Sequence, residues 1–165
     1  MLGVVLHTYE GGQLTLDERY FPVVIATWAG TVSSDGVQQY YEWYGGMLKR
    51  AADEGVRLQS ITDGLDVGRV PSGIRARFIE ESNVRAEEIR DHVDFVMIVA
   101  RRAFLLGFIA SVLYRMRWGV RMSSFSDVGQ ALDRAQLRLE AAGVPRPAGF
   151  EPASYEGPAF QRAVA

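Results

Sequence analysis

Strand-like and helix-like segments alternate along this sequence from residue 21 onward, and this alternation constrains the fold more than any other feature. The clearest strand is VDFVMIVA at residues 93–100, which is apolar nearly throughout. Alternating strands and helices imply right-handed crossover connections and a mainly parallel sheet. We predict further strands at residues 21–30, 56–65 and 120–125, and helices at residues 74–90, 102–118 and 126–142, with a first helix that begins near residue 33.

The two ends of the chain complete a single-domain organisation. Residues 13–20 (QLTLDERY) alternate apolar and polar side chains and are predicted to pair antiparallel beside the sheet. Residues 1–12 add a candidate N-terminal strand. We therefore expect one α/β domain over residues 1–143, with a mixed, mainly parallel sheet of about five strands and four helices. Residues 144–165 hold four of the six prolines, a composition that predicts an extended C-terminal tail.

Composition excludes several classes of function. The chain has no cysteine, and its two histidines, His7 and His92, lack ligand spacing, so no metal centre is predicted. The 18 basic and 20 acidic residues are interspersed, which argues against a nucleic-acid partner. No phosphate-binding glycine loop and no GxSxG elbow occurs, so we predict no cofactor and no catalytic residue. The N-terminus does not have the pattern of a signal peptide, and we expect a cytoplasmic protein.

The segment ITDGLDVGRVPSGIRARFIEE, residues 61–81, carries the main functional question. Asp63 and Asp66 lie at the carboxyl end of a predicted strand, the end at which open α/β sheets bind ligands. Neither has a histidine or lysine nearby in the sequence, so shaping a loop is the simpler role. Ser72 opens the next helix and has two interpretations. It is either the helix cap or a phosphorylation site, whose added charge would face the helix dipole and the side chains of Arg69, Arg75 and Arg77.

The order of elements and this segment resemble the STAS domain, the SpoIIAA-like fold of anti-sigma factor antagonists. In that family a strand ends in a polar residue, an apolar residue follows four positions on, and Asp-Ser-Ser-Gly opens the next helix. Asp63, Val67 and Ser72 match this pattern, with Ser72 at the position of the regulated serine. Pro71 and Gly73 replace the family's aspartate and second serine. The resemblance covers residues 13–142, including MSSFSDVGQALDRAQLRL near the end, and implies a divergent member.

The helix predicted at residues 102–118 is unusual because residues 103–114 (AFLLGFIASVLY) are apolar nearly all round. This run is too short to cross a bilayer, which takes about 20 residues. A helix that is apolar on every side is expected to be buried on every side. Several covers for this helix stay open. The proline-rich tail could fold back over it, anchored by Phe150, Tyr155 and Phe160, or a second copy could pack there in a homodimer. The other candidates are a lipid or membrane surface attracted by the flanking arginines, another protein, and an ordinary core.

Three functions therefore stay open. The first is a non-enzymatic signalling module of bacterial type, which docks a regulatory protein partner through residues 66–77 and is switched at Ser72. The second is a lipid-binding or apolar-ligand-binding domain that uses helix 103–114. The third is an enzyme that uses Asp63 or Asp66. The candidate partner-binding residues are Asp63, Asp66, Arg69, Gly73, Arg75, Arg77 and Trp43, the last at the edge of the first helix's apolar face. The candidate apolar-ligand or dimer surface is Leu105, Phe108 and Val112.

Overall fold

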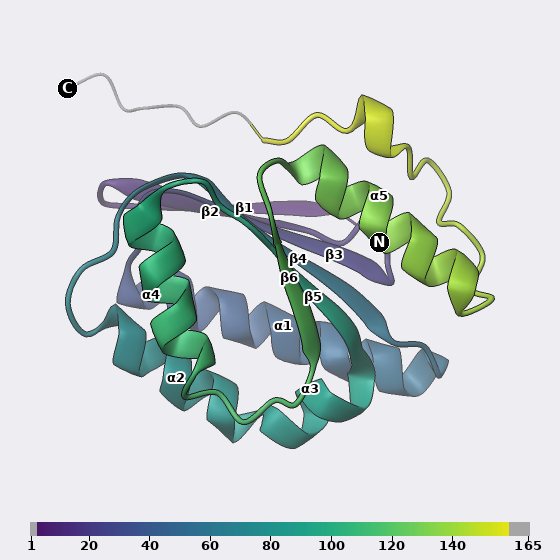
Figure 1. Cartoon of the computed structure of the whole chain (residues 1–165), viewed down its shortest axis with the longest axis horizontal. Coiled ribbons are helices and arrows are strands. Elements are labelled where there is room, and N and C mark those ends of the chain that lie inside the picture. Colours follow the sequence, from purple (N-terminus) through teal and green to yellow (C-terminus); the bar gives the residue numbers. More distant parts are fainter. Residues whose placement is uncertain (1–2, 159–165) are drawn as a thin grey trace.

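A six-stranded sheet forms the centre of the molecule, and its strands lie side by side in their sequence order (Figure 1). The structure is a computed structural model that describes residues 3–158. β1, β2 and β3 pair antiparallel, whereas β3 to β6 pair parallel. The predicted mixed, mainly parallel sheet is confirmed, with one more strand than expected. The strands are β1 (Val4–Tyr9), β2 (Gly12–Asp17), β3 (Val23–Thr31), β4 (Leu58–Arg69), β5 (Val93–Val99) and β6 (Arg121–Phe125).

Helices cover both faces of this sheet. Four of them, α1 to α4, pack against one face, and α5 packs against the other with the C-terminal segment (Figure 1). The helix predicted at residues 74–90 is divided in two, because the backbone of Arg85 leaves the helical conformation and its amide donates to Ser82 O at 3.2 Å. The helices are α1 (Ser34–Glu54), α2 (Ile74–Val84), α3 (Ala86–His92), α4 (Ala103–Leu113), α5 (Val128–Ala141) and the short 3-10 helix η1 (Pro152–Ser154).

The starts of α1 and α5 follow directly from their sequences. Ser33 Oγ accepts a hydrogen bond from the amide of Gly36 at 2.9 Å, and Asp127 Oδ1 accepts one from the amide of Gln130 at 2.9 Å. Each bond satisfies a free N–H of a first helical turn. The apolar side of α1 faces the sheet as its spacing predicts, with these residues buried: Val37, Tyr40, Tyr41, Tyr44, Met47 and Leu48.

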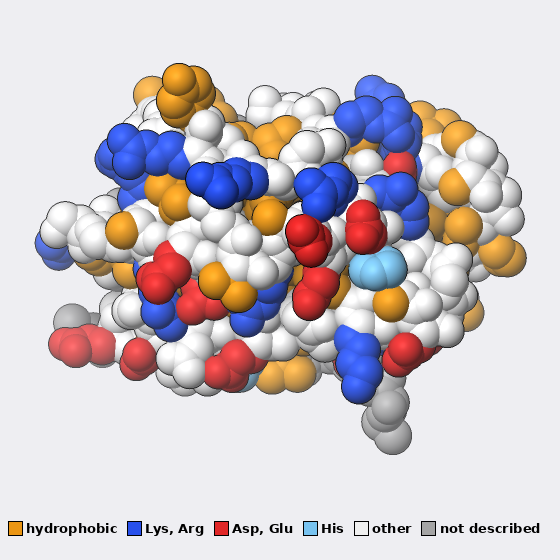
Figure 2. All heavy atoms as spheres, turned by 90° about the horizontal axis from the view of Figure 1, so that it is seen from below, with side chains coloured by type: hydrophobic (Ala, Val, Ile, Leu, Met, Phe, Trp, Pro, Cys, Tyr) orange, Lys and Arg blue, Asp and Glu red, His pale blue; other side chains and the backbone are white. Residues whose placement is uncertain are grey.

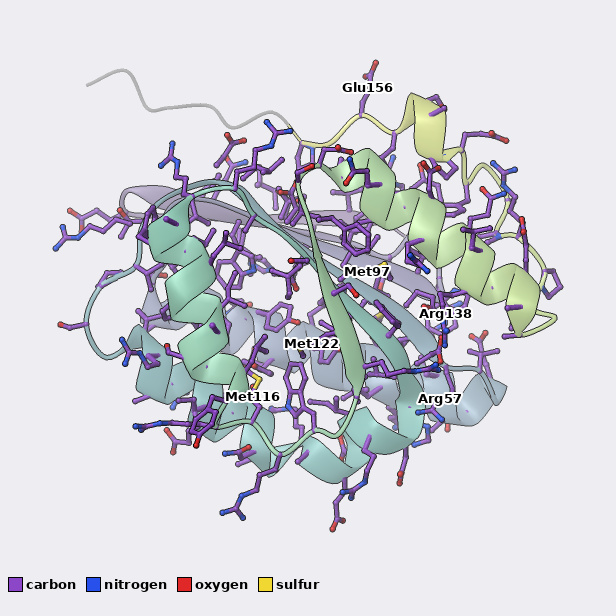
Figure 3. The ribbon with its side chains drawn as sticks, viewed as in Figure 1. Arg57, Met97, Met116, Met122, Arg138 and Glu156 are labelled. Atoms are coloured by element: carbon purple, nitrogen blue, oxygen red, sulfur yellow. The ribbon has the colours of Figure 1, made fainter. Side chains whose placement is uncertain are left out.

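The C-terminal segment packs on the face of the sheet that α5 covers. Phe150 is buried there, 5.4 Å from the ring centroid of Tyr20, and Tyr155 lies 6.3 Å from the same ring. Farther along, the side chain of Glu156 points away from the protein (Figure 3). The expectation that this tail covers helix 103–114 is wrong for these residues, because α4 lies on the opposite face. The third expected anchor, Phe160, lies outside the described residues.

A carboxylate at the start of β5 ties three elements together. Asp94 accepts two hydrogen bonds from Arg138 of α5, at 2.8 and 2.6 Å, and one from Gln59 of β4 at 2.9 Å. Arg121 of β6 adds an ion pair at 3.2 Å. Partial burial of the carboxylate opposes ionisation, but these bonds prevail and lower the pKa of Asp94 below its usual value. Figure 3 shows Arg138 on α5 above Arg57, on the side of the sheet away from α4.

Candidate functional site

Strand β4 continues past Asp63 for six further residues. Its second half pairs with β3, where Asp66 lies opposite Ala29 and Arg69 lies opposite Thr31, whereas its pairing with β5 ends at Asp63. The strand therefore runs beyond its predicted end at residue 65, through a segment expected to be a loop, and that expectation is wrong. The glycines in this stretch indicated a loop, but the long partner strand β3 supplies hydrogen bonds that keep it extended.

Ser72 lies in the turn between β4 and α2, with its side chain exposed to solvent. The N-cap of α2 is Gly73, whose φ of 90° is a left-handed conformation that favours glycine. No side chain caps this helix, and the amide of Ile74 reaches only Pro71 O at 3.4 Å. The cap interpretation of Ser72 is thus wrong. Its hydroxyl stabilises no helix end.

The exposed surface around Ser72 contains part of the predicted set. Asp66, Arg69 and Arg75 are exposed, together with Gly73. Arg77 is different because its guanidinium pairs with Glu81 at 2.9 Å within α2. Among the described residues, Arg69 and Arg75 form no ion pair, so both can contact a ligand or partner. We call Asp66, Arg69, Ser72, Gly73 and Arg75 the Ser72 surface.

Asp63 does not belong to the Ser72 surface. Its neighbours Thr62 and Gly64 face α4, so the alternation of the strand turns Asp63 to the opposite face, with α5 and the tail. There it is only 9% exposed and accepts a hydrogen bond from the amide of Leu65 at 3.0 Å. Burial raises the pKa of Asp63, and the nearby Asp66 carboxylate adds to this effect. Asp63 is therefore buried and Asp66 exposed, although the Asp66 carboxylate stays close enough to act on that of Asp63.

Trp43 lies on α1, half-buried beside the tyrosines of its own helix. Its ring centroid is 6.2 Å from that of Tyr40 and 6.3 Å from that of Tyr44. Within residues 3–158 its indole N–H is buried without an acceptor. Trp43 is thus mainly a packing residue whose outer edge stays accessible.

An apolar cavity of about 100 Å³ lies between the sheet, α2 and α4. The three predicted side chains of α4, Leu105, Phe108 and Val112, line it, and the first and last are buried. They are therefore not available as a surface for a second copy. Figure 3 shows Met116, also a lining residue, at the C-terminal end of α4. The remaining walls include Trp28, Tyr40, Tyr41, Phe78, Ile98, Ile109 and Trp118.

The chemistry of this cavity is that of an apolar container. Its polar atoms come from tyrosine, serine, threonine and tryptophan, and no charged residue lines it. The Tyr41 hydroxyl hydrogen-bonds Ser82 Oγ, and burial raises the pKa of Tyr40 to about 12. Both phenols are therefore neutral at ordinary pH. Among residues 3–158, no group of three or more histidine, aspartate or glutamate side chains is arranged to hold a metal ion.

The outer side of α4 is exposed, contrary to the expectation that the helix is buried all round. Phe104 is 47% exposed, Leu106 is 38% exposed, and Tyr114, just after the helix, is 92% exposed. Sequence reasoning chose the inward residues and missed these three. The arginines at both ends of the run were the available signal that one side faces outward. No helix within residues 3–158 has both the length and the apolar character needed to cross a bilayer.

No protein-family model matches this sequence, and no curated protein matches it. Some solved structures do match this chain. One is an uncharacterized protein of the DUF3478 family with a SpoIIAA-like fold from Shewanella loihica PV-4, at 10% identity over 81% of this chain and 93% of that chain, with a TM-score of 0.49. Another is an anti-sigma factor antagonist from Mycobacterium paratuberculosis, at 8% identity over 82% and 95%, with a TM-score of 0.43. Both scores lie below 0.5, so we infer the function of this chain from its own residues. The chain is thus similar to these two proteins over most of its length, one of which is described as having a SpoIIAA-like fold.

Proposed function

We propose that this chain is a non-enzymatic, STAS-like signalling module that docks a protein partner through the Ser72 surface, with phosphorylation of Ser72 as the switch. The observation that carries this proposal is the exposed Ser72 hydroxyl, which has no structural role because Gly73 begins α2 without a side-chain cap. A kinase or a partner can therefore reach this oxygen without disturbing the helix.

The surroundings of Ser72 suit a phosphate group. A phosphoserine carries nearly two negative charges and three acceptor oxygens. Here these oxygens would face the uncapped N–H groups of the first turn of α2, where the helix dipole favours negative charge. Arg69 and Arg75 are exposed in the same surface and form no ion pair among the described residues. Phosphorylation would thus change the charge of the surface and leave α2 folded.

Binding experiments with charge variants test this proposal. The wild-type protein, Ser72→Glu and the double variant Arg69→Glu/Arg75→Glu are used as bait in the extract of the native cell, and bound proteins are identified by mass spectrometry. Ser154→Glu is the matched control, because Ser154 is an exposed serine in the tail, on the other face of the sheet. We expect one partner that wild type and Ser154→Glu retain and that both Ser72-surface variants lose.

Other outcomes separate the alternatives. If all four baits retain the same partner, docking occurs elsewhere and the Ser72 surface has no part in it. If the Arg69/Arg75 variant alone loses the partner, the surface docks but Ser72 is not its switch. Ser72→Glu is expected to fold normally, because an acidic side chain at a helix start is stabilising.

A second candidate, binding of a small apolar ligand, is favoured by the cavity under α4. A cavity of about 100 Å³ is smaller than the roughly 300 Å³ of a typical ligand site. The candidate ligand is therefore a compact apolar molecule rather than a lipid. Indole serves as the probe, and we expect it to raise the melting temperature of the wild type and not that of Val112→Phe, which fills the cavity. Equal shifts would exclude this site.

An enzyme that uses Asp63 or Asp66 has the least support. Neither residue lines the cavity, and the two carboxylates face different surroundings. Asp63 is hydrogen-bonded to its own strand, while Asp66 is exposed. A catalytic carboxylate is expected in a cleft beside a second titratable group; Asp66 does act on Asp63, but only Asp66 is accessible to a substrate.

A further inference from the structure

Charge is distributed unevenly along the chain, and the unit from β5 to β6 is basic. Residues 95–126 contain no aspartate and no glutamate, although the whole chain carries 20 acidic residues and a net charge of −2. The only charged side chains in this stretch are five arginines, placed on both sides of α4: Arg101, Arg102, Arg115, Arg117 and Arg121.

Four of these arginines are not neutralised. Arg121 pairs with Asp94, whereas the other four are exposed and form no ion pair within the described chain. Arg101 and Arg102 donate to backbone oxygens, those of Ser126 and Val67, which hold them at the start of α4. Positive charge there opposes the helix dipole. An anionic partner would offset the unfavourable charge of Arg101 and Arg102, whereas Arg115 and Arg117 follow the C-terminal end of α4, where positive charge is favourable.

Figure 2 shows this asymmetry from below. Basic side chains gather toward the upper edge of the view, which is the side nearest the viewer in Figure 1, where α4 and β6 lie. Over the rest of this view, acidic and basic side chains are mixed. In this view, the side of the molecule that carries α4 and β6 thus presents more basic than acidic side chains.

Between the arginines, the outer side of α4 is apolar. Phe104 and Leu106 are exposed near its start and Tyr114 just after its end. The Ser111 hydroxyl, which is half-buried, donates to Phe108 O at 2.7 Å and leaves little polar character on this side. A groove of about 480 Å³ runs between α4 and the edge strand β6, where Figure 3 places Met122. Its apolar walls are Ile98, Leu106, Ile109, Ala110, Leu113 and Met122.

We propose that α4 and its flanking arginines form a docking surface for an anionic phospholipid membrane. The helix lies parallel to the membrane plane, with Ala103, Gly107 and Ala110 of its outward face and the neighbouring Tyr114 toward the acyl boundary. Phe104 and Leu106 lie at the two edges of this face, and the arginines lie at the level of the headgroups. Apolar and aromatic side chains bordered by arginines are the composition of helices that lie in this interface. Arginine stems cover apolar surface while their guanidinium groups reach phosphates. This surface shares no residue with the Ser72 surface, although Arg102 at its edge donates to Val67 O, close to Arg69.

The charge pattern disfavours a second copy as the occupant. Arginines stand at both ends of α4, so parallel and antiparallel pairing of two such helices both bring like charges together. The exposed side of α4 also has few groups that can donate or accept hydrogen bonds, apart from the Tyr114 hydroxyl, and so offers little to specify a polar protein surface. Negative headgroups above an apolar layer match both features.

Co-sedimentation with lipid vesicles tests the proposal. The full chain is mixed with vesicles of phosphatidylcholine alone, or of equal parts phosphatidylcholine and phosphatidylglycerol. We expect binding to the anionic vesicles only, weakened by added salt. Arg115→Gln/Arg117→Gln should lose affinity about fivefold for each arginine, and Tyr114→Ser should lower it further. The matched controls, Arg90→Gln/Arg134→Gln and Leu137→Ser, replace exposed residues elsewhere and should bind like wild type.

Three results would overturn the proposal. The first is no sedimentation with either vesicle. The second is an equal loss in the test and control variants, which would mean adsorption through charge alone. The third is a dimer in analytical ultracentrifugation that Tyr114→Ser dissociates, which would make a second copy the occupant. Ser72→Glu should bind vesicles like wild type, so failure here leaves the proposal for the Ser72 surface intact.

Discussion

At the scale of single residues, Ser33 and Ser72 both precede helices and have different roles because the backbone around them differs. Ser33 has an extended backbone that brings Oγ within 2.9 Å of the Gly36 amide. Before α2, the cap position belongs to Gly73, in a left-handed conformation that turns the chain without any side chain. A serine precedes a helix at both sites, so backbone geometry decides the role of each serine.

Alanine substitution of the two serines should separate these roles. Ser33→Ala removes a helix cap and should lower the free energy of unfolding by about 1 kcal/mol. Ser72→Ala removes no intramolecular bond and should change it by only a few tenths. Urea denaturation of both variants measures the difference. Equal losses would show that Ser72 does cap α2.

Two aspartates of the sheet, Asp94 and Asp63, have pKa values shifted in opposite directions. The pKa of Asp94 is lowered, so its contribution to stability is complete above about pH 4, the ordinary value, and is lost as pH falls through the folded pKa. Asp94→Asn should therefore cost about 1–3 kcal/mol at neutral pH and little in acid. Denaturation curves at several pH values measure this difference.

Two matched variants control for general effects of the Asp94 substitution. Asp91→Asn changes an exposed carboxylate with no ion pair among the described residues and should be neutral. Asp63→Asn should not destabilise at neutral pH, because burial already disfavours its charged form and an amide oxygen can still accept from Leu65. A loss in Asp63→Asn as large as that in Asp94→Asn would contradict this account.

At the scale of elements, the contact between β4 and α4 depends on one glycine. A Cβ atom at Gly64 would stand 2.9 Å from Leu105 Cδ2, so any side chain there displaces α4 or the leucine. This close approach lets α4 cover the stretch of β4 that β5 leaves unpaired. In the same place, Arg102 donates to Val67 O at 3.1 Å.

Gly64→Ala should destabilise the protein by about 1–3 kcal/mol through overpacking. In a Leu105→Ala background the same change should cost less, because the clashing methyl group is absent, and a double-mutant cycle measures this coupling. Gly46→Ala is the control. Gly46 is an exposed position of α1 with no other atom within 4 Å of its Cβ, and alanine there should stabilise by about 1 kcal/mol. If the effects of Gly64→Ala and Leu105→Ala on stability are additive, the two residues are not in contact.

Most elements follow from local pattern, and the exceptions depend on distant partners. Helix α1 was predictable because its apolar spacing from Val37 to Leu48 and its cap at Ser33 agree. The second half of β4 was not, because Gly64 and Gly68 are loop signals that the pairing with β3 overrides. The outward side of α4 was also not predictable, because apolar residues surround the helix and only the tertiary arrangement decides which of them face water.

At the scale of the whole molecule, the tail and α4 stabilise opposite faces of the sheet and should respond independently. Phe150→Ala removes the buried anchor of the tail and should cost about 3–5 kcal/mol. Hydrogen exchange should then rise over residues 144–158 and α5, and stay unchanged in α4. Increased exchange in α4 would mean that the tail supports both faces. Leu137→Ala, at a residue of α5 that is 58% exposed, is the matched control.

The candidate site was only partly predictable from the sequence. Resemblance at Asp63, Val67 and Ser72 predicted one surface, yet strand alternation turns Asp63 to the other face, and Arg77 is engaged by Glu81. Side-chain direction depends on where a strand continues and where a helix begins. The end of β4 and the start of α2 were hard to predict because the glycines at positions 64, 68 and 73 are loop signals.

Because the strands are ordered in space as they are in the chain, this sheet can be assembled in the direction of synthesis. Each strand that leaves the ribosome meets an edge already formed by its predecessor, and no later strand has to be inserted between two earlier ones. The face that α5 and the tail cover is the exception, since it stays open until these last segments have been synthesised. A nascent chain halted after β6 would therefore expose Ile25, Ile61 and Met97 to chaperones, and emergence of α5 would close that side.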